Sequence, residues 1–263
     1  MQRDATEPRG TTAASRVAVL LDLDGTLLDG SGLPAALRTT GERLARLAPG
    51  LDPDRFVAAH TAVWQELWPE VEDEWMLGHG AAAGIERRAW AGALTRCGFD
   101  DPALVDAAES IHPESVQAAH RAYPEVPAAL ADLRAAGWAT AIVTNGAGSL
   151  QRAKIADAGL DGTTDLVVVS SEVGVAKPTP GIAEHALLEL GADPARSWFV
   201  GDNLWVDIEV GSRVGLGTVW VNRRQRIRPD TAPAPDLEVA DLAGLAERIA
   251  AVRTPGRSST RTG

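Results

Sequence analysis

Short apolar runs, separated by longer stretches with a helical pattern, follow one another along much of the chain. Most of the runs lack a strict alternation of apolar and polar positions, which is typical of parallel strands buried on both faces. They predict strands at residues 17–21, 140–143, 166–169, 198–200 and 218–221. Apolar residues at three- and four-residue steps predict helices between the later runs, at residues 127–136, 149–158, 180–190 and 204–214.

A glycine stands where each of these helices should end, at Gly137, Gly159, Gly191 and Gly215. Glycine adopts the left-handed conformation that closes many helices without a steric penalty. Strands that alternate with helices in this way predict an α/β fold with a doubly wound, Rossmann-like parallel sheet. Such sheets bind ligands at the carboxyl ends of their strands, so we expect the chemistry there.

Residues 33–120 show helical patterns only. Asp-Pro pairs at 52–53 and 101–102 are typical helix starts, because aspartate accepts free backbone amides and proline needs no hydrogen bond in the first turn. After the first pair, apolar and aromatic side chains recur on one helical face: Phe56, Val57, His60, Val63, Trp64, Leu67 and Trp68. The pattern predicts an inserted helical subdomain that could close over the strand ends and exclude water.

The insertion divides the expected core into two parts of the chain. We expect a core of residues 16–32 and 121–250 and a helical cap of residues 33–120. Residues 1–15 and 251–263 are polar and aperiodic, so we expect both to be mobile tails without a part in the chemistry.

Composition and charge narrow the classes of partner. The formal net charge of −11 disfavours nucleic acid and anionic membrane surfaces, whereas a small anion carried in with a cation is compatible with it. Cys97 is the only cysteine and forms no internal disulfide, and the amino end lacks the apolar stretch of a secretory signal. No segment approaches the roughly 18 apolar residues that span a bilayer. We expect a cytoplasmic protein, a monomer or a homodimer.

Polar residues with catalytic potential stand at successive strand ends. The first strand runs into two carboxylates, Asp22 and Asp24, and Gly25 permits a turn after them. If the strand continues that far, alternation places both carboxylates on one side of it. Thr144 and Asn145 follow the second core strand in the stretch VTNG.

Three further charged residues follow later strands. Lys177 stands between turn residues in GVAKPTPG, just before a predicted helix. The stretch GDNLWVD places Asp202 after a strand and Asp207 in the first turns of the next helix. Each fragment alone is common in loops and helix caps, but their order and their placement make the set specific.

In this order the motifs resemble those of the haloacid dehalogenase-like (HAD) hydrolase superfamily, in the branch with a helical cap inserted after the first motif. The resemblance covers residues 17–222 and rests on DLDGT, VTN, Lys177 before Pro178, and GDNLWVD. In the cap it extends only to length and helical character. It implies a HAD core and a Mg²⁺-dependent phosphatase that acts on a small phosphorylated metabolite.

The resemblance also implies a role for each residue. Asp22 is then the nucleophile that attacks phosphorus and forms an aspartyl-phosphate, while Asp24 protonates the leaving oxygen and later activates water. Thr144, with Asn145 beside it, binds the phosphoryl group. Lys177 neutralises charge on that group and on Asp22.

A Mg²⁺ site is implied as well, formed by Asp22, Asp202 and the backbone carbonyl of Asp24, with Asp207 behind these ligands or as an occasional ligand. The electrostatic repulsion between neighbouring carboxylates agrees with a metal site. At about 4 Å and an effective dielectric constant near 20, a pair of carboxylates repels by about 4 kcal/mol. Mg²⁺ prefers hard oxygen ligands, offsets their repulsion and can bridge to a phosphate oxygen.

Two alternatives to the phosphatase stay open. A phosphomutase passes the aspartyl-phosphate to a sugar rather than to water, and a phospho-acceptor or binding module combines similar residues without turnover. Dehalogenases of the superfamily lack the second acid, so Asp24 favours phosphoryl transfer. Gln151 and Lys154, after TNG, are similar to segments of nucleotidase and acylneuraminate-phosphate phosphatase relatives, which favours a nucleotide or a sugar phosphate.

The remaining polar and aromatic residues receive no catalytic role. The histidines share no metal-ligand spacing and are expected at surface or packing positions: His60, His79, His112, His120 and His185. The tryptophans are expected to pack, except that Trp205, close to Asp202, is a candidate to border the pocket. The basic run Arg223–Arg228 predicts a solvated loop.

Overall fold

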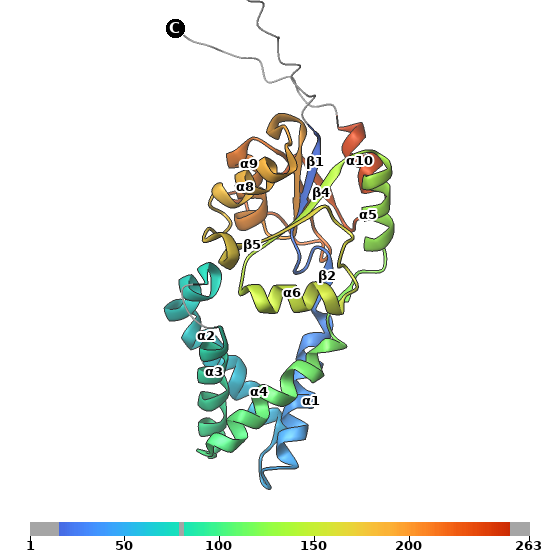
Figure 1. Cartoon of the computed structure of the whole chain (residues 1–263). Coiled ribbons are helices and arrows are strands. Elements are labelled where there is room, and N and C mark those ends of the chain that lie inside the picture. The colour runs from blue at the N-terminus through green and yellow to red at the C-terminus, as the bar shows by residue number, and fades with distance from the viewer. Residues whose placement is uncertain (1–15, 79–81, 253–263) are drawn as a thin grey trace, which may run out of the picture.

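The computed structural model describes residues 16–78 and 82–252. A six-stranded parallel sheet in the order β5-β4-β1-β6-β7-β8 forms its centre. The strands are β1 (Ala18–Leu21), β4 (Ala139–Thr144), β5 (Leu166–Val169), β6 (Trp198–Gly201), β7 (Gly217–Val221) and β8 (Leu237–Val239). Each strand that the apolar runs predict is present, and the α/β parallel fold is confirmed (Figure 1).

Helices cover both faces of the sheet. Figure 1 shows α8 and α9 on one side and α5 and α10 on the other. The helices of the core are α5 (Val126–Ala135), α6 (Gly148–Asp157), α7 (Ser170–Val173), α8 (Gly181–Leu190), α9 (Glu209–Val214) and α10 (Leu245–Ala251). In β1, Val19 and Leu21 belong to the apolar cluster that includes α5 and α10, whereas Ala18 and Leu20 belong to the cluster of α8. Burial on both faces explains the unbroken apolar run.

β1 lies at the middle of the sheet, between β4 and β6. Its register pairs Leu21 with Ile142 on one side and with Val200 on the other. The chain extends the sheet from β1 through β4 to β5 and then returns to the other side of β1 to add β6, β7 and β8. The direction of strand addition thus reverses at β1, and doubly wound sheets bind ligands in the crevice at such a reversal.

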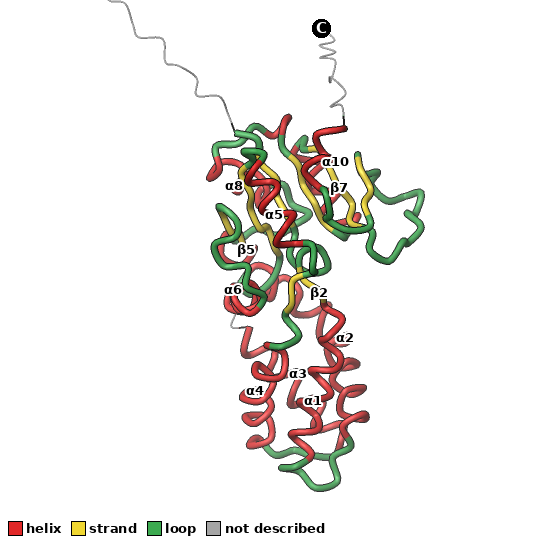
Figure 2. The backbone as a smooth tube through the Cα atoms, turned by 90° about the vertical axis from the view of Figure 1, so that its right-hand side faces the viewer, coloured by secondary structure: helices red, strands yellow, loops and turns green. Residues whose placement is uncertain are grey.

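Between β2 (Leu28–Asp29) and β3 (Arg121–Ala122), a short antiparallel pair, the described residues are helical. The helices are α1 (Leu33–Ala45), α2 (Pro53–Leu77), α3 (Ala82–Cys97) and α4 (Pro102–Gln117). Figure 2 shows them as a bundle beyond one end of the sheet, and β2 lies between the two. We propose that this bundle is the cap expected at residues 33–120.

Local sequence signals set the ends of the helices. The Asp52 carboxylate accepts the backbone amides of Asp54 and Arg55 at 2.9 and 3.1 Å, and Asp101 accepts the amide of Ala103 at 2.9 Å. Both predicted N-caps are therefore confirmed. The four glycines expected at helix ends have φ values between 62° and 83°, which is the left-handed conformation that ends a helix.

Aromatic rings pack α2 against α3. The His60 ring lies 4.2 Å from the ring of Trp90, measured between centroids, and its Nε2 accepts a hydrogen bond from Trp64 Nε1 at 3.1 Å. Phe56 stacks on the same Trp90 ring. The aromatic stripe that the sequence predicts on this helix is thus the interior of the bundle, and His60 belongs to its packing.

Several parts of the core differ from the sequence-based expectation, including the unpredicted short elements β2, β3 and α7. The helix predicted at 204–214 is a π-helical turn at Leu204–Ile208 followed by α9, because the Asn203 carbonyl attracts the amides of both Asp207 and Ile208, at 2.8 and 3.3 Å. β8 and α10 were not predicted from the apolar pattern. β8 is only three residues long with a glutamate at its centre, so no apolar run marks it.

The expected tails lie almost entirely outside the described residues, as does His79. Residues 1–15 and 253–263 are not described, and Ala251, which the expected second tail includes, is the last residue of α10. Within 16–78 and 82–252, no helix is both long and apolar enough to cross a membrane.

Acid should weaken the helical bundle through His60. Burial, with a contribution from His112, lowers the pKa of His60 from 6.5 to about 4. Between these values the unfolded chain binds a proton that the folded protein does not. The contribution of His60 to stability is therefore complete above pH 6.5 and falls as the pH drops toward 4, by at most about 2 kcal/mol near pH 5. Denaturant unfolding followed by tryptophan fluorescence at a series of pH values measures the loss.

The matched variant is His60→Phe, which keeps a ring between Trp64 and Trp90 but has no proton to bind. Its free energy of unfolding should fall less than that of the wild type over the same pH range. Equal losses in both proteins would show that His60 is not responsible.

Candidate active site

Asp22 directly follows β1, at the carboxyl end of the sheet, where doubly wound folds bind ligands. β1 ends at Leu21, and the Asp22 amide still donates to the Val200 carbonyl of β6 at 2.9 Å. The turn that follows is tight. Gly25 has a φ of +83°, and a Cβ atom there would lie 2.7 Å from Asp202 Oδ2, so glycine is needed on both grounds. This close approach brings Asp202 beside the chain that carries Asp22.

Lys177 reaches Asp22 from the loop before α8. Asn145, directly after β4, holds the Lys177 main chain from both sides. Its Nδ2 donates to the Lys177 carbonyl at 2.8 Å, and its Oδ1 accepts the Lys177 amide at 2.9 Å. The ammonium group donates to Asp22 Oδ1 at 2.6 Å and to Asp207 Oδ1 at 2.7 Å. The Lys177 side chain is only 2% exposed, so these ion pairs form away from water.

Three carboxylates converge at this point. One oxygen from each of Asp22, Asp202 and Asp207 lies within 4.8 Å of the others. The main chain of Asp202 is fixed because its carbonyl accepts Trp220 Nε1 at 3.0 Å, and Asp207 is fixed because its Oδ2 accepts the Asn203 amide at 3.0 Å. Compact sets of carboxylate oxygens suit a hard divalent cation, and Mg²⁺ in particular. The residues present therefore fit the metal that the family resemblance implies.

Burial dominates the electrostatics of these acids. It raises the pKa of Asp22 to about 7, against the pull of the Lys177 ammonium and with a contribution from Asp207. Burial also raises the pKa of Asp202 to about 6, where Asp22 adds to the rise and Arg226 opposes it. The pKa of Asp207 is raised for the same reason. One ammonium does not compensate three carboxylates, so a further cation would stabilise the cluster.

Asp24 is held by α6 rather than by Lys177. Lys154 Nζ donates to the two carboxylate oxygens of Asp24 at 3.0 and 2.9 Å, and Gln151 Nε2 donates to one of them at 3.1 Å. The same Gln151 amide donates to Thr144 Oγ1 at 2.6 Å. Burial raises the pKa of Asp24, but Lys154 and Gln151 outweigh it and hold the pKa below its usual range.

The structure thus arranges the sequence-predicted residues in two groups. The first group is Asp22, Lys177, Asp202 and Asp207, with Asn145 behind the lysine. The second is Asp24 and Thr144, joined through Gln151. The condition for placing both carboxylates on one side of the strand is not met, because β1 stops at Leu21 and Asp24 already belongs to the turn. The turn lets its side chain reach α6 instead of the first group.

Sequence reasoning did not assign Gln151 and Lys154 to the site, although it singled them out through a resemblance. A physical signal for them exists. They lie three residues apart on α6, so their side chains share one face of that helix. The helix follows the strand that ends in Thr144, and a helix after such a strand lies beside the crevice. What the sequence does not give is the orientation of that face toward Asp24.

A hollow of about 220 Å³ lies where α2 meets the core. It is lined by Glu74, Trp75, Gly78, Ala147, Gly148, Ser149 and Ser171. A Cβ atom on Gly146 would lie 3.6 Å from Trp75 Nε1 and 3.4 Å from the Gln151 side chain, so the indole and the amide flank the same glycine. The Gly146 amide also donates to Ser170 Oγ, which donates to the Met76 carbonyl of α2. The end of α2 therefore borders the site beside Gln151.

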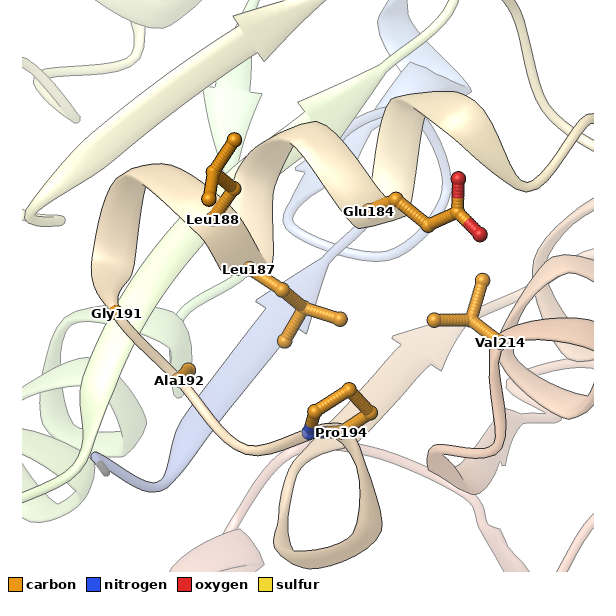
Figure 3. Close-up of a pocket in the computed structure, with 7 residues that line it drawn as sticks. All are labelled: Glu184, Leu187, Leu188, Gly191, Ala192, Pro194 and Val214. Atoms are coloured by element: carbon orange, nitrogen blue, oxygen red, sulfur yellow. The ribbon is translucent and has the colours of Figure 1, made fainter. Parts of the chain in front are cut away.

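Another hollow, of about 350 Å³, lies between α8 and the segment before β6 (Figure 3). Its lining is Glu184, Leu187, Leu188, Gly191, Ala192, Pro194 and Val214. It adjoins the amino end of β1, because the Arg16 amide donates to the Gly191 carbonyl at 3.1 Å. It therefore lies at the opposite end of the sheet from Asp22. Trp205, the candidate to border the pocket, is 51% exposed and lines neither hollow.

Comparison with known proteins assigns the family. The model of the family described as haloacid dehalogenase-like hydrolase matches residues 17–215, which include all seven sequence-predicted site residues. The chain belongs to the haloacid dehalogenase-like hydrolases, as the order of its motifs indicates. The fold and the crevice at the carboxyl end of β1 agree with this membership.

Two curated relatives match along most of their length. A phosphoserine phosphatase of Thermus thermophilus is 34% identical to this chain, over 85% of the chain and 95% of the relative. A glyceraldehyde 3-phosphate phosphatase of Methanopyrus kandleri is 33% identical, over 86% of the chain and 91% of the relative. Both relatives are named as phosphatases of small metabolites.

Solved structures agree in fold. The HAD-hydrolase YfnB from Bacillus subtilis, described as putative and bound to magnesium, superposes with a TM-score of 0.67 at 23% identity, over 89% of this chain and 99% of that one. A 2-haloacid dehalogenase from Pseudomonas syringae superposes with a TM-score of 0.66 at 24% identity, over 89% and 98%. At these identities the likeness concerns the fold alone, and it includes a dehalogenase.

Removing the ammonium group from the first group of residues should destabilise the core. In Lys177→Met, the buried carboxylates of Asp22 and Asp207 lose the partner that both contact, and breaking such a buried pair costs about 3–5 kcal/mol. Thermal unfolding in the presence of a chelator should show the loss. Added Mg²⁺ should raise the melting temperature of the variant more than that of the wild type, because it supplies the missing positive charge.

Lys154→Met is the matched control, since its partner Asp24 is 49% exposed and water can solvate the carboxylate. We expect a much smaller change in melting temperature for it. If the two variants unfold at the same temperature, Lys177 does not balance a buried charge cluster.

Proposed function

We propose that the protein is a Mg²⁺-dependent phosphatase that hydrolyses a small phosphate monoester through a phosphorylated Asp22. The observation that carries the proposal is the contact of one buried ammonium, Lys177, with Asp22 and Asp207, beside the third carboxylate of Asp202. An anion that enters this crevice meets one cationic side chain and a set of oxygens suited to a divalent cation. A phosphate ester fits that combination.

In this proposal Asp22, Asp202 and Asp207 hold the metal, together with the backbone carbonyl of Asp24. When bound, Mg²⁺ supplies positive charge that offsets the repulsion between Asp22 and the phosphate oxygens. Lys177 stabilises the charge that develops on the transferring group. Asn145 keeps Lys177 in place through its two contacts with the lysine main chain.

The reaction proceeds in two steps at Asp22. Its carboxylate oxygen attacks phosphorus, the bond from phosphorus to the alcohol oxygen breaks, and that oxygen takes a proton from Asp24. Water then attacks the phosphorus of the aspartyl-phosphate and gives a proton to Asp24. Phosphate leaves and the Asp22 carboxylate is restored.

The surroundings of Asp24 suit both of its tasks. In the structure, Lys154 and Gln151 favour its ionised form, the form that accepts a proton from water. A phosphate dianion close to Asp24 raises its pKa by repulsion, which favours the protonated form needed for the leaving oxygen. Gln151 also contacts Thr144, so the residue proposed to bind the phosphoryl group and the residue proposed to move the proton share one hydrogen-bond donor.

Dehalogenation is the competing chemistry, because dehalogenases share this fold. Asp24 argues against it. A halide ion leaves without a proton, so a second acid held by Lys154 and Gln151 would have no task in that reaction. An alkoxide leaving group needs the proton that Asp24 can supply.

A small substrate agrees with the relatives. Those described above are named for phosphoserine and glyceraldehyde 3-phosphate, which are small phosphate monoesters. We propose a small phosphorylated metabolite, a nucleotide or a sugar phosphate. A screen of phosphate release over a metabolite panel with Mg²⁺ would identify it.

Replacing the nucleophile tests the mechanism. Asp22→Asn keeps the size of the side chain but removes its negative charge, so turnover of p-nitrophenyl phosphate should fall on the order of 10³-fold or more. Circular dichroism should show an unchanged fold. Retained turnover in a folded variant would exclude Asp22 as the attacking group.

Removing the metal provides a second test. Treatment with a chelator should abolish phosphate release, and Mg²⁺ should restore it, whereas the larger and less strictly octahedral Ca²⁺ should restore little.

The same assay on a hexose phosphate should measure free phosphate and the isomeric ester separately. Formation of the isomer without free phosphate would instead identify a phosphomutase, and release of halide from a 2-haloacid without phosphatase activity would identify a dehalogenase.

A further inference from the structure

The loop after β7 contains an arginine that is bound into the molecule rather than solvated. The sequence pattern predicts a solvated loop at Arg223–Arg228, yet the Arg223 side chain is only 15% exposed. Its Nε donates to the Gly25 carbonyl at 3.2 Å and its Nη2 donates to the Thr26 carbonyl at 2.8 Å. These two carbonyls belong to the turn that directly follows Asp24.

The other contacts of Arg223 lie on the chain that returns from the helical bundle. Its Nη1 is 2.8 Å from a Glu125 carboxylate oxygen, and its guanidinium carbon is 3.4 Å from the centroid of the Tyr123 ring. Tyr123 follows β3 directly, and its amide donates to the Leu27 carbonyl at 3.0 Å. One side chain therefore joins the turn after Asp24 to the linker between the bundle and the core.

The chemistry of this contact requires a guanidinium. Arg223 uses three of its nitrogens in three directions, while its flat face lies against the Tyr123 ring. A planar group with five donors in a fixed arrangement can do this, whereas the single ammonium of lysine cannot cover the same positions. Glu125 neutralises the charge, so the arginine can be largely buried.

A shift of the turn would disturb the proposed reaction. Gly25 packs directly against the Asp202 carboxylate, and Asp22 and Asp24 lie just before it in the chain. Movement of the turn would therefore change the position of Asp24 relative to both Asp22 and Asp202. A misplacement of about 1 Å can lower a rate about 100-fold, because proton transfer and in-line attack depend on alignment.

We propose that Arg223 is a positioning residue that fixes the turn after Asp24 against the linker of the helical bundle, so that Asp24 keeps its position relative to the nucleophile. The arginine touches neither the reacting atoms nor the metal-binding oxygens and acts through the main chain of Gly25 and Thr26. This inference rests on the proposed function of Asp24 and extends it to a loop that has no other assigned part in the reaction.

The test compares Arg223→Ala, Arg223→Lys and Arg224→Ala. Arg224 is exposed and adjacent in sequence, so its variant controls for the loss of a positive charge from this loop. With p-nitrophenyl phosphate and Mg²⁺, Arg223→Ala should lose about 10- to 100-fold in kcat with little change in KM. Arg223→Lys should recover only a small part of that loss. Arg224→Ala should stay within about twofold of the wild type.

Chemical rescue separates positioning from general loss of structure. Guanidinium ion at a concentration well below the denaturing range should restore part of the kcat of Arg223→Ala and none of that of Arg223→Lys, whose side chain fills the space. Backbone hydrogen exchange should rise in Arg223→Ala at residues 23–28 and 121–124 and stay unchanged in the central strands.

The outcomes are distinct. A kcat within twofold of the wild type in Arg223→Ala, or a loss without rescue and with faster exchange throughout the sheet, overturns the proposal. If the wild type itself hydrolyses no phosphate ester, the proposed function fails. The exchange pattern then decides alone whether Arg223 joins the turn to the linker: selective loosening of the two segments supports that link, and uniform or unchanged exchange refutes it.

Discussion

Like charges forced together in a buried crevice are the constraint on which this structure depends. Asp22 follows β1, whereas Asp202 and Asp207 lie together after β6, and burial raises the pKa of each. Lys177 opposes their repulsion by contact with two of them, and Asn145 fixes the main chain that carries it. The sheet, with β1 between two fully buried neighbours, supplies the rigid frame that keeps such an arrangement from relaxing. Burying these three carboxylates side by side costs free energy of folding, and such a local cost is typical of sites that bind an ion or a substrate.

The sequence predicted the fold well because the parallel sheet depends on a simple physical rule. Strands buried on both faces need continuous apolar runs, and each apolar run in the sequence corresponds to a strand of the sheet. Two of the failures have local causes. β8 lies at the edge of the sheet, where a polar residue such as Glu238 is tolerated, so no apolar run marks it. The helix expected from residue 204 begins as a π-helical turn in which the Asn203 carbonyl accepts the amides of both Asp207 and Ile208, and the Asp207 side chain is held there by the Asn203 amide and by Lys177.

The site was only partly predictable. Position at a strand end is encoded in sequence order, and it led to Asp22, Thr144 and Asp202. The direction in which each side chain points does not follow from the order of the strands. The turn at Gly25 directs the Asp24 side chain toward α6, and only the packed structure shows that Lys154 donates a hydrogen bond to it. Arg223 illustrates the same limit. A run of arginines in an acidic protein has the composition of a solvated loop, and the burial of Arg223 within it follows from its position after β7, beside the turn and the linker.

The insertion of the helical bundle also has a consequence for synthesis and folding. Ala18 of β1 pairs with Ala139 of β4, and Val19 pairs with Trp198 of β6, so the central strand leaves the ribosome long before either neighbour exists. Pairing between residues so distant in sequence closes large loops and is intrinsically slow. The helices of residues 33–117 contact one another locally and can form first. We therefore expect β1 to stay without a partner strand until β4 has been synthesised, and an unpaired apolar strand favours aggregation during that interval.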